Sequence, residues 1–129
     1  MLEQYKETFD RITTIEHEFA NGCREHPNAI SAIMLELAGH YTFLNSQKTE
    51  LEVAKFREAI KIRNELSVEY SLSGQKMVKT QLEQMIDSKL ESLVSQIMTL
   101  EGKLQNVDKL ISVCQSSLKS IDREKRMPY

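Results

Sequence analysis

An unbroken heptad stripe of apolar residues constrains this chain more than any other feature. The stripe occupies the C-terminal third, and its steps alternate between four and three residues over about five heptads. Because an α-helix has 3.6 residues per turn, this spacing keeps one narrow apolar seam on one side of a long helix, and such a seam requires a partner helix. The stripe consists of Ile86, Leu90, Leu93, Ile97, Leu100, Leu104, Val107, Ile111, Cys114, Leu118 and Ile121.

The partner of this seam can be a second chain or another helix of the same chain. An inter-chain seam makes the stripe an oligomerisation element, whereas an intramolecular seam makes it one arm of a helical hairpin. Val94 and Leu110 widen the apolar face beyond the heptad positions, so the two arrangements can coexist. The residues assigned to oligomerisation are Leu90, Leu93, Ile97, Leu100, Leu104, Val107, Ile111, Cys114, Leu118 and Ile121.

Composition agrees with a chain of long helices. The 129 residues are enough for one domain, and they include two prolines and four glycines. Aromatic residues make up 6%, so the core should be aliphatic and follow the helix seams. We predict a single all-α domain in which long helices form a helical hairpin with a C-terminal heptad helix, in an oligomer. Its segments are an N-terminal helix over 1–25, a long helix over 28–70, a turn over 71–79 and a heptad helix over 80–126.

Capping and turn signals set these limits. Pro27 disfavours helix at the residue before it, and Asn28 is the expected N-cap of the long helix. The stretch 70–75 reads as a turn because it is rich in Ser and contains Gly74. Thr80 with Glu83 fits a capping box, and so does Ser88 with Glu91. Two start signals predict either a short helix followed by a long one or a kink at residues 87–88.

The first two helices also carry apolar faces at helical spacing. In the N-terminal helix the residues at helical spacing are Tyr5, Phe9, Ile12, Ile15 or Glu16, Phe19 and Cys23. His40 lies beside the face of the long helix and is expected to be partly buried with a polar partner. That face is expected to contain Ile30, Ile33, Leu37, Tyr41 and Leu44, and then Leu51, Phe56, Ala59, Ile62 and Leu66.

A local group of basic residues is the best candidate for a functional surface. The net charge of −2 argues against a simple nucleic-acid binder, so a polyanion would have to meet a local patch. Arg57 and Lys61 are four residues apart and repel, which suggests that something else favours them. Tyr70 could stack on an unpaired base. The candidate nucleic-acid-binding residues are Lys55, Arg57, Lys61, Arg63, Tyr70, Lys76 and Lys79. The alternative is a solvated face balanced by Glu58, Glu65 and Glu69.

No residue set indicates catalysis, so we expect no enzyme activity and no cofactor. His17, Cys23 and His26 are close in sequence but do not make the four-ligand set of a structural metal site, and no metal is expected. The start of the chain has no signal-peptide pattern, and no apolar run approaches the roughly 20 residues of a membrane span. We therefore expect a cytoplasmic protein without membrane association, with its two cysteines reduced.

Several short segments, spread over roughly residues 29–125, resemble the UvsY-type recombination mediators of phages. Residues 59–63 (Ala-Ile-Lys-Ile-Arg) look like a Leu-Lys-Ala-Arg segment that a tyrosine and a Ser-Gly turn follow in that family, as here. Residues 78–82 (Val-Lys-Thr-Gln-Leu) are similar to a Met-Lys-Thr-x-Leu segment after that turn. Cys114, Leu118 and Ile121 match a Cys-x-x-x-Leu-x-x-Ile pattern with a trailing arginine, here Arg123. The order and spacing of these segments carry the resemblance.

The resemblance implies an all-α protein that assembles into a ring-like homo-oligomer through C-terminal helices. It implies binding to single-stranded DNA and contacts with a RecA-like recombinase and a single-strand-binding protein, so that the recombinase can load without hydrolysis by the mediator. The resemblance also implies that Lys61 and Arg63 contact DNA and that the protein is located in the cytoplasm of the host cell. The alternative function is a structural or adaptor coiled coil that binds only protein partners.

Overall fold

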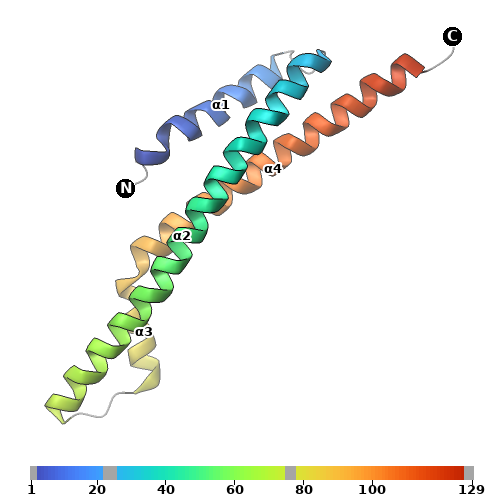
Figure 1. The fold of residues 1–129 in the computed structure, drawn as a ribbon. Coiled ribbons are helices and arrows are strands. Elements are labelled where there is room, and N and C mark those ends of the chain that lie inside the picture. Colours follow the sequence, from blue (N-terminus) through green and yellow to red (C-terminus); the bar gives the residue numbers. More distant parts are fainter. Residues whose placement is uncertain (1–2, 22–25, 75–77, 127–129) are drawn as a thin grey trace. The chain divides into compact units, whose positions relative to one another are not determined.

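A computed structural model describes residues 3–21, 26–74 and 78–126. Every element in these ranges is helical, which confirms the all-α prediction. In chain order they are a short 3-10 helix η1 (Glu3–Tyr5) and the α-helices α1 (Lys6–Ala20), α2 (Pro27–Ser73), α3 (Lys79–Lys89) and α4 (Glu91–Arg126), labelled in Figure 1. No helix in this described part of the chain is both long and apolar enough to cross a membrane.

Helix α2 begins earlier and ends later than the capping and turn signals of the sequence predict. The backbone N–H of Ile30 donates to the carbonyl of His26 at 3.0 Å, so the helix starts at Pro27 and the predicted N-cap role of Asn28 is wrong. Proline suits this first helical position because its missing N–H would have no partner there. At the other end, the helix continues to Ser73 rather than stopping at residue 70. Gly74 ends it with a φ of +72°, a left-handed conformation that glycine adopts readily.

The predicted C-terminal helix over 80–126 is divided in two at Leu90. Helix α3 starts at Lys79, after an extended Val78 that makes no side-chain cap, so the capping box at Thr80 is wrong. Leu90 has φ −94° and ψ 0°, and its N–H donates to the carbonyls of both Ile86 and Asp87, at 3.0 and 3.2 Å. The short helix followed by a long one is therefore the correct alternative, with its break two residues beyond the predicted kink.

The described residues form two compact units that share α2 and α4. Unit 1 comprises Met1–Asn45 and Glu101–Tyr129. Tyr5 of η1 contacts α2 through the ring of Phe43, and the two ring centroids lie 6.4 Å apart. Helix α1 contacts α4 where the Lys103 ammonium lies 5.1 Å from the Phe9 ring centroid. Cys23 lies outside the described residues, and Tyr41 is exposed rather than part of the apolar face. The aliphatic and aromatic core residues of unit 1 include Ile12, Ile15, Phe19, Ile30, Ile33, Leu37, Leu44, Leu104, Val107 and Cys114.

Unit 2 comprises Ser46–Leu100. Its core is a cluster of four buried side chains from α2, α3 and the residue between α3 and α4. Partly buried apolar side chains on the same elements and on α4 pack around the cluster. This packing holds the second part of α2 against α3 and the start of α4 inside unit 2. The buried members are Ile62, Leu66, Ile86 and Leu90, and the surrounding ones are Ala59, Leu82, Leu93 and Val94.

Candidate nucleic-acid interface

Four of the residues predicted to contact nucleic acid are cations on one continuous stretch of α2 in unit 2, and all four are exposed. We call Lys55, Arg57, Lys61 and Arg63 the basic segment. At 1.5 Å per residue the segment extends roughly 12 Å along the helix axis. A helix of this kind holds the Cα atoms of the four cations at fixed spacing, so the charges do not have to be brought together by loop closure.

The hydrogen-bond donors of the basic segment are not taken up by ion pairs in the described part of the chain. No ion pair joins its four cations to any described acidic residue, although Glu58, Glu65 and Glu69 lie on the same helix. Nearby on α2, Lys48 does form such a pair, with its Nζ 3.6 Å from Oε1 of Glu52. The acidic neighbours therefore lower the net charge of this surface without occupying the hydrogen-bond donors of the cations.

The other three predicted contacts have different surroundings. Tyr70 is half-buried, and its hydroxyl lies 4.0 Å from the sulfur of Met85 in α3. Lys79 is exposed at the start of α3, and no hydrogen bond or ion pair among the described residues joins it to the basic segment. Lys76 lies outside the described residues.

Phe56 is the residue of this surface that sequence reasoning placed wrongly. It was expected on the apolar face of the long helix, but its side chain is 68% exposed between two cations of the basic segment. At 100° per residue, Phe56 is rotated by about 120° from Ile62, which is in the core. The three-residue step from Phe56 to Ala59 suggests a shared face. The rotation between Phe56 and Ile62 is the signal in the sequence that separates Phe56 from the core.

The residues predicted for oligomerisation are largely covered within a single chain. Leu90, Ile97, Leu100, Leu104, Val107 and Cys114 are buried, whereas Leu93, Ile111, Leu118 and Ile121 are half-buried. Side chains that are already buried add little apolar area when a second chain binds. The burial thus favours the intramolecular alternative for most of the seam and leaves its C-terminal positions partly open.

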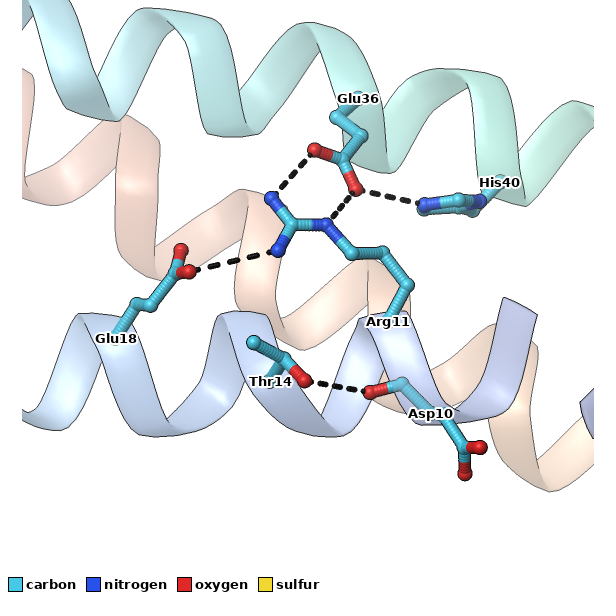
Figure 2. Close-up of polar contacts among 6 residues, drawn as sticks. All are labelled: Asp10, Arg11, Thr14, Glu18, Glu36 and His40. Atoms are coloured by element: carbon cyan, nitrogen blue, oxygen red, sulfur yellow. Dashed lines mark hydrogen bonds and ion pairs between the residues drawn. The ribbon is translucent and has the colours of Figure 1, made fainter. Parts of the chain in front are cut away.

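A polar cluster in unit 1, which the sequence did not indicate, fastens α1 to α2 (Figure 2). The Arg11 guanidinium donates from Nη2 to Oε1 of Glu36 at 2.8 Å and from Nε to Oε2 of the same carboxylate. His40 lies with Nε2 3.0 Å from Oε2 of Glu36, and Glu18 accepts a longer bond of 3.4 Å from Arg11. His40 is half-buried with a polar partner, as predicted.

The charges of this cluster shift the titration of its two central groups. Hydrogen bonding to Arg11 lowers the pKa of Glu36 to about 2, and His40 acts in the same direction with a smaller effect. The hydrogen bonds that Arg11 donates to Glu36 raise the pKa of Arg11 above its ordinary value. Both groups therefore remain charged at neutral pH, and the cluster serves as an ion-pair clamp between helices rather than as a source of protons.

An open hollow next to this cluster is lined by residues of α1 and the beginning of α2, among them His17, Glu18, Asn21 and His26. Within the described ranges no three His, Cys, Asp or Glu side chains come together in a way that could hold a metal ion. Comparison of the chain with family models, with curated proteins and with solved structures finds no match.

Proposed function

We propose that this protein binds single-stranded DNA through the basic segment of α2 and acts, as an oligomer, as a recombination mediator. The observation that carries the proposal is the set of four exposed cations within about two turns of α2, none of them in an ion pair with a described residue. Lysine and arginine are the side chains that contact phosphate, and arginine adds a two-point fork.

The energetics of this surface call for more than one copy. Each phosphate neutralised releases condensed counterions, which gives a single strand a slope of about −0.7 per contact in the logarithm of affinity against the logarithm of salt. Three or four contacts give one subunit only modest affinity at physiological salt. Several basic segments that engage the same strand raise the affinity through effective concentration.

The assembly proposed here uses helix α4. The second part of α2 and the elements that cover Ile62 and Leu66 form a helical hairpin, and a ring-like oligomer forms through α4 positions that a single chain leaves partly open. These are Ile111, Leu118 and Ile121. This arrangement assigns the buried part of the heptad stripe to folding and its C-terminal part to assembly.

The mediator role is supported by the ordered motif segments that resemble the UvsY-type proteins. In this role the protein holds the strand and contacts a RecA-like recombinase and a single-strand-binding protein. It helps the recombinase to replace the single-strand-binding protein on the DNA. The steps are exchanges of bound protein and need no bond to be made or broken by this chain. The proposed location is the cytoplasm of a host cell.

The test is fluorescence anisotropy with a labelled oligonucleotide across a salt series. Lys61→Ala combined with Arg63→Ala should weaken binding and reduce the magnitude of the salt slope by about 1.4, because two contacts at about 0.7 each are lost. The matched control is Lys109→Ala with Lys119→Ala, which removes the same charge from exposed positions of α4 and should leave the slope unchanged. Anisotropy that stays flat at low salt with the unmodified protein would exclude DNA binding.

A structural or adaptor role without DNA is the second candidate. The exposed Met98 and Val113 on α4 favour it, because exposed apolar side chains on a helix suit a protein partner. It predicts oligomers with no affinity for the labelled oligonucleotide at any salt concentration.

A further inference from the structure

Three exposed apolar side chains run along α2 beside the basic segment. Val53, Phe56 and Ile60 are 44%, 68% and 45% exposed, although residues of this type are usually buried. Their spacing of three and four residues places them on one strip of the helix surface, and we call them the apolar strip. Inside unit 2 this strip is turned away from the face that carries Ile62 and Leu66.

Two cations of the basic segment, Arg57 and Arg63, border the apolar strip. Arg63 follows Phe56 by seven residues and Ile60 by three, so these three residues share one line along the helix. Arg57 is four residues beyond Val53 and three before Ile60, on the other border of the strip. An apolar surface with an aromatic ring thus has an exposed arginine on each side, and neither arginine forms an ion pair with a described residue.

A second copy of the same surface is a poor occupant for this strip. A standard protein interface buries roughly 800 Å² on each partner, far more than three partly exposed side chains can supply. Two copies in symmetric contact through the strip would also bring the arginines Arg57 and Arg63 of one chain close to those of the other, and like charges at close range are costly. The occupant that fits both features is a planar apolar group attached to an anion.

We infer that the Phe56 ring is a stacking platform for an unpaired nucleic-acid base, with Ile60 and Val53 as its apolar surroundings and Arg57 and Arg63 at the flanking phosphates. This inference rests on the proposed DNA-binding function and adds to it the reason for selecting single strands. In a duplex the base faces are covered by neighbouring base pairs, whereas every base of a single strand offers a face to an aromatic side chain. Binding without the ring would be governed by phosphate contacts alone.

The chain contains no tryptophan, which allows a direct optical test. Phe56→Trp introduces a single indole, and its fluorescence should be quenched when oligothymidylate binds, since a base in stacking contact deactivates the excited indole. The matched control is Leu35→Trp, a position on α2 that is 78% exposed and lies in unit 1, where the fluorescence should not change. Equal responses of the two variants would contradict stacking at Phe56.

The affinity test compares oligothymidylate with an abasic oligonucleotide of the same length. Phe56→Ala should weaken binding to oligothymidylate by about 5- to 150-fold. The Phe56→Ala variant should bind the abasic strand as the unmodified protein does. The Phe56→Tyr variant should keep most of the affinity for oligothymidylate that Phe56→Ala loses. Because the side chain is mostly exposed, the helix content by circular dichroism should stay the same.

The outcomes separate this inference from the function on which it rests. Binding of both strands with no effect of Phe56→Ala would overturn the stacking role and leave the phosphate-binding function in place. Binding of neither strand would remove both. If a poly-glutamate peptide bound as tightly as oligothymidylate, and lost as much on Phe56→Ala, the strip would be a surface for acidic protein segments and the base-stacking role would be wrong.

Discussion

Arg11 of α1 and Glu36 of α2 form a two-point ion pair across 25 residues of sequence, with Nη2–Oε1 at 2.8 Å and a second bond from Nε to Oε2 (Figure 2). The pair is only partly shielded, since the Arg11 and Glu36 side chains are 40% and 33% exposed. Its contribution to stability is therefore smaller than that of the core contacts. It fixes how α1 lies along α2 in unit 1 by a means that apolar periodicity does not specify.

The Glu36 carboxylate should make unfolding sensitive to acid. Its pKa is lowered to about 2, so its favourable contribution is complete above the ordinary value near 4.5 and is lost as the pH falls from 4.5 towards 2. Glu36→Gln should lower the melting temperature at pH 6 and flatten its dependence on pH in that window. Thermal unfolding followed by circular dichroism between pH 2 and 6 measures both effects. Glu16→Gln, an exposed position on α1, is the control, and an identical pH profile for the two variants would refute the clamp.

Packing of α1 should depend on Ile15, whose side chain is fully buried. Ile15→Ala should reduce the free energy of unfolding by about 2–5 kcal/mol, because it removes buried methyl groups and leaves a cavity. Leu35→Ala, at a side chain that is 78% exposed, should change it by less than about 0.5 kcal/mol. Urea unfolding of the two variants gives the comparison. Equal midpoints would mean that α1 does not pack as described.

Replacement by alanine should change the stability of the protein in opposite directions at two glycines, Gly39 inside α2 and Gly74 at its C-terminal end. Gly74 has a φ of +72°, so Gly74→Ala should destabilise the protein by about 1 kcal/mol even though a Cβ atom would meet no neighbour. Gly39 lies inside α2 with open space where its Cβ would be, and Gly39→Ala should stabilise by about 0.5–1 kcal/mol. Thermal melts of both variants test this, and a stabilising Gly74→Ala would contradict the end of α2 at this position.

Assembly should depend on the half-buried end of the heptad stripe. The combined change of Ile111, Leu118 and Ile121 to Gln should reduce the mass measured by light scattering to that of one chain, 14.9 kDa. Such a change at half-buried positions should preserve most of the helix content, because the buried seam residues stay apolar. The control is Lys109→Ala with Lys119→Ala, which leaves the apolar positions intact. A single-chain mass for the unmodified protein at micromolar concentration would remove the oligomer from the proposal.

The apolar spacing by itself determined the helical nature of this chain and much of its core. The stripe from Ile86 to Ile121 required a helix with one covered side, and seven of its positions are buried in the single chain. Periodicity works here because hydrogen bonding within a helix fixes which side chains share a face. Local sequence also marked Gly74 as a stop and signalled the separation of α3 from α4.

Only the tertiary structure decided which faces are covered and by what. Phe56 and Ile62 are both apolar residues of α2, yet one is 68% exposed and the other is 4% exposed. The difference arises because neighbouring elements of unit 2 cover the side of α2 that carries Ile62, and nothing local in the chain specifies that choice. The Arg11–Glu36 pair has the same origin, since residues 25 positions apart meet only when two helices pack. Local spacing thus determines which residues share a face, and burial of that face depends on long-range contacts.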